Sequence, residues 1–329
     1  MNNINSFDNV LFGNGLSIKI IQNLKSNGIT IIDFFDYLHY FLLLDKHKYE
    51  KRRFYKLYKE VVYDDEIPLA EHFILETIEE AKNIGFERMM SSKAFIVQDI
   101  LTKYSITQEK YDRLFITASM YYFLLFNYWY VNEVLNKIDL NSICILEISK
   151  KIKNVINDSI YTLSFDTYLD SFLPIKHVHG QFALSCNQFS DIVSMKISPT
   201  RFLYKFIFGT QGYEKSCAIN NVHNHNIPCF DYEFMFGDKN FGNLLIYGVA
   251  FGLSNIIPLN LKGKYEDFYL MNCVEGHILK RLNELYKHKK IQSITIACYS
   301  PSDKSNYIEL FQHLECNDIV KYINASELF

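Results

Sequence analysis

Short apolar runs, each ending in glycine or polar residues, recur along this chain between stretches of helical spacing. Short continuous apolar runs are typical of strands that a parallel sheet buries on both faces. Alternation of such runs with helical patterns predicts an α/β fold with a Rossmann-like parallel sheet. The candidate strands are residues 10–12, 160–163, 175–178, 244–251, 268–271 and 291–298, with a candidate edge strand at 319–323.

The spacing of these strands also predicts how the chain is organised. Residues 30–140 contain a single proline, Pro68, and their apolar side chains recur at helical spacing. We interpret residues 30–140 as a large helical insertion within one domain that spans residues 1–329. Residues 183–240 are mixed in pattern and predict a small, loop-rich subdomain. Because large exposed apolar patches are rare, the aromatic side chains of the insertion predict self-association into a homo-oligomer.

Composition narrows the classes of partner. A formal net charge of −3 gives no electrostatic case for nucleic acid or an anionic membrane. The longest apolar stretches, residues 34–44 and 120–131, are too short to span a bilayer. Seven irregularly spaced cysteines and the lack of a secretory signal predict reduced thiols and a cytoplasmic protein. The spacing of Cys217, His223, His225 and Cys229 fits no standard zinc site, so we expect no metal.

The first candidate strand runs into a glycine-rich turn, with Gly13, Asn14 and Gly15 ahead of a helical pattern that begins near Ser17. Glycines allow a sharp turn and a close backbone approach, and a following helix directs N–H groups at a phosphate. The Ser17 hydroxyl would add a contact. The pattern is not the full G-x-G-x-x-G fingerprint, and an ordinary tight turn is the alternative interpretation. Asn14 is then either a ligand contact or a turn residue.

Two further candidate strands end in chemically versatile residues. Ser164 and Asp166 follow the strand at 160–163, while His177 and His179 flank Val178 at the next strand end. Polar groups at the carboxyl ends of parallel strands gather at one edge of the sheet. Asp166 would either cap a following helix, contact ligand hydroxyls, or do both.

Taken in order, these segments resemble the sirtuin superfamily. Residues 13–17 are similar to its Gly-Ala-Gly-Ile-Ser turn, 162–166 to its Thr-Gln-Asn-Ile-Asp strand end, and 179–183 to its His-Gly strand end. Residues 244–250 resemble its later strand with a Gly-x-Ser turn, and 270–272 resemble the strand whose Asn meets adenosine. The resemblance is strongest to divergent prokaryotic sirtuin-like domains of antiviral defence, including the AbiH-like group. Many of those domains hydrolyse NAD.

The resemblance implies an NAD hydrolase of bacterial anti-phage defence that cleaves the nicotinamide–ribose bond. It implies that His179 is the general base and that Ser164 occupies the second catalytic position, with His177 in a supporting role. It implies NAD as substrate or ligand, and a co-encoded defence partner such as an ATPase. The residues implied to bind NAD are Gly13, Asn14, Gly15, Ser17, Asp166, Gly248 and Asn272.

Three departures from the family pattern leave other interpretations open. Ser164 replaces the family's catalytic Asn, Ala250 replaces a serine, and Cys186 has no partner in a paired CxxC zinc ribbon. The alternative is a sensor or structural subunit that binds NAD or ADP-ribose without turnover, and Ser164 favours it. An inactive variant of a parent enzyme with Asn at this position is a third interpretation. Protein deacetylation ranks last, because no zinc ribbon frames an acyl-lysine channel.

Overall fold

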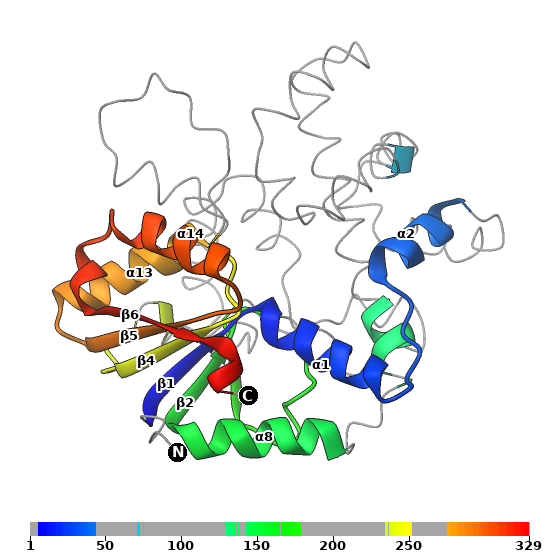
Figure 1. Ribbon diagram of the computed structural model, residues 1–329, viewed down its shortest axis with the longest axis horizontal. Coiled ribbons are helices and arrows are strands. Elements are labelled where there is room, and N and C mark those ends of the chain that lie inside the picture. Colours follow the sequence, from blue (N-terminus) through cyan, green and yellow to red (C-terminus); the bar gives the residue numbers. More distant parts are fainter. Residues whose placement is uncertain are drawn as a thin grey trace, which may run out of the picture.

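Six parallel strands form one sheet in the order β3-β2-β1-β4-β5-β6 (Figure 1). This computed structural model describes residues 6–43, 71–72, 75, 129–135, 137, 143–164, 166–178, 234–235, 237–251 and 275–328. The parallel sheet confirms the predicted α/β, Rossmann-like fold. Its strands are β1 (Phe7–Phe12), β2 (Ile156–Thr162), β3 (Ile175–His177), β4 (Gly242–Tyr247), β5 (Ile291–Cys298) and β6 (Val320–Asn324).

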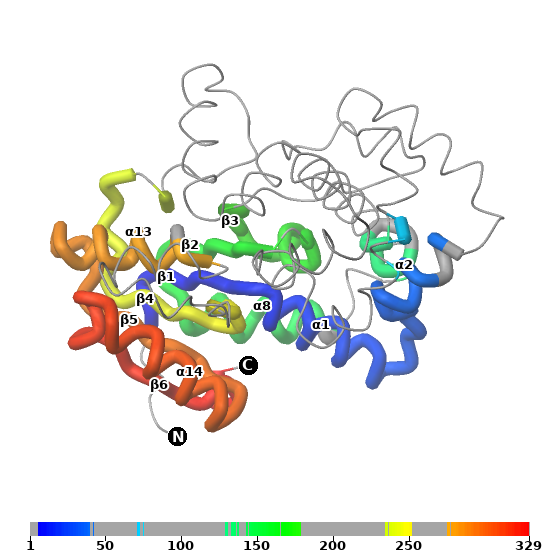
Figure 2. The backbone as a smooth tube through the Cα atoms, turned by 90° about the horizontal axis from the view of Figure 1, so that it is seen from above, coloured from blue at the N-terminus to red at the C-terminus, as the bar shows by residue number. Residues whose placement is uncertain are grey.

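The centre of the sheet is β1, which pairs with β2 on one side and β4 on the other. Figure 2 shows β1 between these neighbours and continuing into α1 (Asn14–Ser26). In the register, Phe12 pairs with both Thr162 and Tyr247, so three strands end at the same level. The residues that follow these strands are therefore neighbours in space, although they lie far apart in the sequence.

Helices cover both faces of the sheet. On one side lie α13 (Gly276–Lys287) and α14 (Pro301–Phe311), and on the other α1 packs against α8 (Ile143–Val155) (Figure 1). Successive side chains of a strand point to opposite faces. Accordingly, Leu11 of β1 joins the cluster under α13, while Phe12 lines a pocket with α1.

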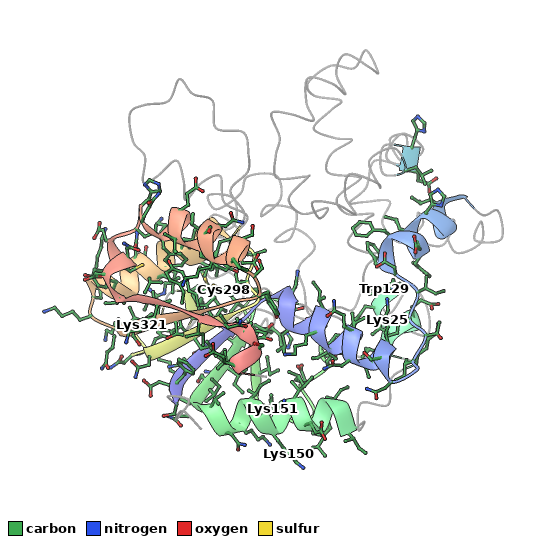
Figure 3. All side chains as sticks on the ribbon, viewed as in Figure 1. Lys25, Trp129, Lys150, Lys151, Cys298 and Lys321 are labelled. Atoms are coloured by element: carbon green, nitrogen blue, oxygen red, sulfur yellow. The ribbon has the colours of Figure 1, made fainter. Side chains whose placement is uncertain are left out.

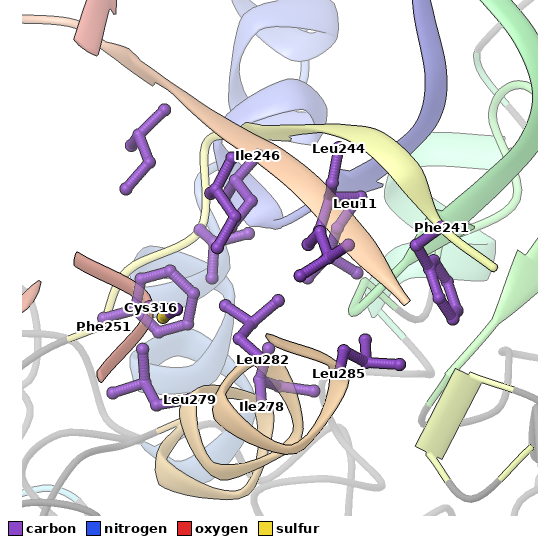
Figure 4. Close-up of a cluster of buried hydrophobic side chains, with 14 of the residues drawn as sticks. Leu11, Phe241, Leu244, Ile246, Phe251, Ile278, Leu279, Leu282, Leu285 and Cys316 are labelled. Atoms are coloured by element: carbon purple, nitrogen blue, oxygen red, sulfur yellow. The ribbon is translucent and has the colours of Figure 1, made fainter. Parts of the chain in front are cut away.

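The core between the sheet and α13 is apolar and closely packed (Figure 4). Leu244 and Ile246 of β4 face Ile278 and Leu282 of α13, and all four side chains are fully buried. Burial of each such side chain stabilises the fold by about 1.5–3 kcal/mol. Ile278, Leu282 and Leu285 recur at helical spacing, which is why this segment forms an amphipathic helix.

The segment before β2 folds as one helix. Its apolar residues at 143–148 and its helical spacing at 152–155 belong to α8, which ends at Val155, and β2 begins at Ile156. Ile145, Ile148 and Ile152 are buried on its inner face. Lys150 projects away from the sheet (Figure 3) and Lys151 is also exposed, so the helix is amphipathic.

The described parts of the predicted insertion are helical. They include α2 (Phe34–Leu43) and a π-helical segment, η3 (Tyr130–Leu135), near the two ends of the insertion. The indole N–H of Trp129 donates to the Ile32 carbonyl at 2.8 Å, and its ring packs on Phe34 with centroids 5.5 Å apart. These contacts join the two ends of the insertion. The rest of residues 30–140, and most of the predicted subdomain at 183–240, lie outside the described residues.

Several element boundaries differ from the sequence prediction. The strand predicted at 244–251 ends at Tyr247, because Gly248 turns the chain with φ +67°. The apolar residues at helical spacing in 307–314 predict a helix there, but α14 begins earlier, at Pro301, where the Ser300 hydroxyl accepts the Asp303 N–H at 3.1 Å as an N-cap.

The carboxyl-terminal elements complete the described chain. The predicted edge strand at 319–323 is β6, between short 3₁₀ helices η4 (Glu315–Ile319) and η5 (Ala325–Glu327). The candidate strand at 268–271 lies outside the described residues. Among the helices that are described, none is both long and apolar enough to cross a membrane.

Candidate functional site

The direction in which strands are added reverses between β1 and β4. From β1 the chain adds β2 and β3 on one side, and it then returns to add β4, β5 and β6 on the other. In open α/β sheets, ligands bind outside the carboxyl ends of the strands at such a switch point. The turns after β1, β2 and β4 therefore define the candidate site.

Three glycines bring the turns after β1 and β4 into direct contact. The Gly13 N–H donates to the Tyr247 carbonyl, and the Gly15 N–H donates to the Gly248 carbonyl, both at 2.9 Å. A Cβ at Gly13 would lie 2.4 Å from the Gly248 oxygen, and one at Gly15 would lie 2.6 Å from the Gly248 Cα. Both distances are shorter than any side chain tolerates. The close approach that we predicted toward a ligand is made here between two backbone turns.

The other glycine-turn residues occupy different environments. Asn14 is exposed at the first position of α1, and its side chain provides no cap, because Gly13 is the N-cap residue. Ser17 lies one turn further along α1 and faces β2. The structure thus brings Ser17, but not Asn14, to the residues that follow β2.

Two serines and a carboxylate meet beside this turn. The hydroxyls of Ser17 and Ser164 lie 3.1 Å apart, and both donate to the same Asp166 oxygen, Oδ2. The Ser164 N–H donates to the Thr162 hydroxyl at 3.0 Å, which fixes the turn after β2. Three residues that the sequence separates by up to 149 positions thus form one polar cluster, which we call the Ser-Asp cluster (Ser17, Ser164 and Asp166).

Asp166 is held in a low-polarity setting. Burial raises its pKa above the usual value, while hydrogen bonds from Ser164 and Ser17 and the nearby His177 oppose the rise. The carboxylate also accepts the Tyr168 N–H. The residues that follow form turns rather than the helix that Asp166 was predicted to cap. Asp166 is therefore a half-buried carboxylate whose hydrogen bonds organise a turn and two hydroxyls.

A small pocket opens beside the Ser-Asp cluster. Its free volume of about 10 Å³ is near the space that one water molecule needs. Polar lining comes from Ser17, Thr162, Asp166 and Asp170, and apolar lining comes from residues such as Phe12 and Ile20. The pocket therefore places a water-sized space against the half-buried Asp166 carboxylate and the hydroxyls of Ser17 and Thr162.

His177 ends β3 behind this pocket. Its Nδ1 lies 3.0 Å from the Ser164 carbonyl oxygen, and its Nε2 lies 3.0 Å and 3.3 Å from the two Asp170 oxygens. The ring is buried, whereas the Asp170 side chain is partly exposed. The sequence predicted a supporting role for His177 but gave no partner for it.

Sequence reasoning missed the tyrosines around the site. The Tyr130 hydroxyl, from the end of the insertion, accepts the Thr167 N–H at 2.7 Å, and its ring meets Tyr168 edge-on with centroids 5.3 Å apart. On the far side, Tyr247 and Tyr299 pack edge-on at 5.5 Å. Aromatic residues were so frequent along the chain that no single one was singled out.

Some predicted site residues are not described. His179, the predicted general base, lies two residues beyond His177, and it and Asn272 lie outside the described residues, as do Cys217, His223, His225 and Cys229. In the part of the chain that the structure describes, no three His, Cys, Asp or Glu side chains come together as a metal site.

The fold and the position of the Ser-Asp cluster define a Rossmann-like α/β protein with a polar site at its switch point. Comparisons with family models, curated proteins and solved structures give no match to this chain.

Proposed function

We propose that this chain binds NAD at the carboxyl edge of its sheet and hydrolyses the nicotinamide–ribose bond. The observation that carries this proposal is the Ser-Asp cluster at the switch point, where two hydroxyls and a half-buried carboxylate converge. Dinucleotides bind in this crevice in doubly wound sheets. A half-buried carboxylate, which can accept several hydrogen bonds, suits the hydroxyls of a ribose or a water molecule.

The reaction needs few groups from the protein. The bond between C1′ of the ribose and the nicotinamide nitrogen breaks, and its electron pair leaves with nicotinamide. A water oxygen then bonds to C1′, and the water loses one proton to a base, predicted to be His179. The pocket beside Asp166 suits that water, and NAD would lie across its mouth. Asp166 and the two serine hydroxyls would orient the water or a ribose hydroxyl.

Ser164 is expected to lower the rate of NAD hydrolysis. Its hydroxyl donates to Asp166, but it is shorter than the Asn of the family pattern and offers no amide. Loss of one well-placed polar group commonly costs about 10²–10³ in rate. We therefore expect tight binding of NAD with slow turnover. The presence of Ser164 where the family pattern has Asn also supports a second candidate function, a sensor that binds NAD or ADP-ribose without turnover.

Nicotinamide release by the purified protein tests the proposal. Ser164→Asn should raise the rate, a further His179→Ala should abolish it, and Asp166→Asn should weaken NAD binding. A Ser164→Asn protein that binds NAD yet releases no nicotinamide, even with co-encoded partners, would replace hydrolysis with the sensor function. Absence of NAD binding in both the wild type and Ser164→Asn would overturn both functions.

The proposed setting is anti-phage defence in the bacterial cytoplasm, with self-association and a co-encoded partner such as an ATPase. It rests on the resemblance of residues 13–17 and 162–166 to defence-associated domains. Cells that express the wild type should plate phage less efficiently than cells that express Asp166→Asn. Equal plating, together with equal cellular NAD after infection, would count against this setting.

A further inference from the structure

The hydrogen bonds of His177 define its protonation. A carbonyl oxygen only accepts hydrogen bonds, so Nδ1, 3.0 Å from the Ser164 oxygen, carries a proton. The Asp170 carboxylate likewise accepts, so Nε2, 3.0 Å from Oδ2, carries the second proton. Both ring nitrogens of His177 thus face acceptors, an arrangement that favours the imidazolium form. The ring joins a partly exposed carboxylate to the main chain of the Ser-Asp cluster.

The electrostatic surroundings agree with this assignment. Burial by itself would lower the pKa of His177, but the hydrogen bond and charge of Asp170, the Ser164 carbonyl and the charge of Asp166 together raise it. Tyr130 and Tyr168 are the titratable neighbours of Asp166 on the far side. Among the described residues that act on the ring, the charged groups are thus both acidic.

The position of His177 at the end of β3 lets it hold the turn that follows β2. His177 pairs with Thr162 in the register of β2 and β3, and the Val178 N–H donates to the Thr162 carbonyl at 2.9 Å. Ser164 is then held at three atoms: its N–H by the Thr162 hydroxyl, its carbonyl by His177, and its hydroxyl by Asp166. Of these three, the His177 bond alone comes from a neighbouring strand.

We propose that His177 and Asp170 form a positioning pair that holds the Ser164 carbonyl and thereby keeps the Ser164 hydroxyl on Asp166, beside the pocket proposed for the reacting end of the nucleotide. This inference rests on the proposed function for its ligand. His177 acts through the Ser164 carbonyl, whereas Asp170 both holds the His177 ring and lines the pocket. Loss of the bond to the carbonyl frees the turn after β2, whereas loss of the bond to Asp170 removes the charge partner.

Two substitutions separate the two hydrogen bonds. His177→Asn retains a donor at the place of Nδ1 and loses the one toward Asp170, whereas His177→Gln retains the donor near Nε2 and loses the one toward Ser164. Equilibrium dialysis with NAD should give an affinity within about 3-fold of wild type for His177→Asn and about 10-fold weaker for His177→Gln, the effect of one lost hydrogen bond. Equal affinities in the two variants would overturn the positioning role.

The pH dependence gives a readout that a packing role would not move. Because folding raises the pKa of His177, its contribution is complete below its unfolded pKa of about 6.5 and is lost as pH rises through the folded pKa. The affinity for NAD should therefore decrease as the pH rises through the folded pKa of His177. In Asp170→Asn, which removes a group that raises this pKa, the decrease should occur at lower pH. Asp158→Asn, which removes an ion pair with Lys239 away from the site, is the matched control. An unmoved profile in Asp170→Asn would overturn the inference.

A separate measurement distinguishes failure of this inference from failure of the proposed function. The ¹⁵N chemical shifts of the His177 ring in the ligand-free wild type should show both nitrogens protonated at pH 7. A neutral ring would overturn the positioning pair whether or not NAD binds. A charged ring in a protein that binds no NAD would overturn the proposed function and leave the ion pair in place.

Discussion

The two halves of the carboxyl edge are built in different ways. Between β1 and β4, backbone meets backbone, and Gly13, Gly15 and Gly248 leave no room for a side chain. Between β1 and β2, side chains meet, and Ser17 and Asp166 share a hydrogen bond across the gap. The first half fixes where the strands end, and the second supplies polar side chains at the pocket. Substitutions in the glycine half should therefore destabilise the fold, and those in the polar half should affect ligand binding.

The largest expected effect is in the glycine half. Gly248→Ala places a Cβ 2.8 Å from the Gly15 Cα at φ +67°, so we expect a loss of about 3 kcal/mol or more in unfolding free energy. Gly28→Ala is the matched control, because Gly28 has φ +85° with nothing within 4 Å, and should cost only about 1 kcal/mol. Urea denaturation measures both. If Gly248→Ala and Gly28→Ala lose similar unfolding free energy, the loss comes from the positive φ alone and not from the contact with Gly15.

An intermediate effect is expected where the insertion meets the polar half. Tyr130→Phe removes the acceptor of the buried Thr167 N–H, which should cost about 1–3 kcal/mol. Tyr286→Phe removes an exposed hydroxyl that donates to Asp318 and should leave the denaturation midpoint unchanged. If Tyr130→Phe also leaves it unchanged, the insertion does not support the segment that carries Asp166.

The smallest expected effect on the fold is at Asp166, where substitution should increase the unfolding free energy rather than decrease it. Folding raises the pKa of Asp166, so the charged form destabilises the native state at neutral pH, and this cost disappears as pH falls through the folded pKa. Asp166→Asn should raise the unfolding free energy at pH 7 by about 1 kcal/mol, with no gain in acid. Thermal melts at several pH values measure the difference. A loss of stability at pH 7 would mean that the hydrogen bonds outweigh the buried charge.

The central strands were predictable because each contains a short apolar run that ends at a glycine or a polar residue. Ile291–Cys298 was predicted with both of its ends, and β6 within one residue. Helix starts were less predictable, because α14 begins at a cap formed by Ser300 rather than at its apolar residues. Local capping chemistry overrides the apolar pattern at such ends.

The candidate site was predictable only in part. Ser17, Ser164 and Asp166 could be proposed as neighbours because parallel strands end at a common edge. The partners of His177 could not, because Asp170 lies in a turn whose geometry no periodicity encodes. Nor could the sequence show that Gly248 packs on Gly13 and Gly15, since such contacts depend on the strand order.

Trp129 is the only tryptophan in the chain, and this gives the protein a built-in optical reporter (Figure 3). Its indole is buried at 6% exposure and adjoins Tyr130, which holds Thr167 beside Asp166. If the segment that contains Thr167 and Asp166 moves, Tyr130 should move with it, and Trp129 is the residue next to Tyr130 in the chain. Emission from the unlabelled protein would then shift to longer wavelength as the ring meets water, so the spectrum reports on the segment that carries Asp166 without any added dye.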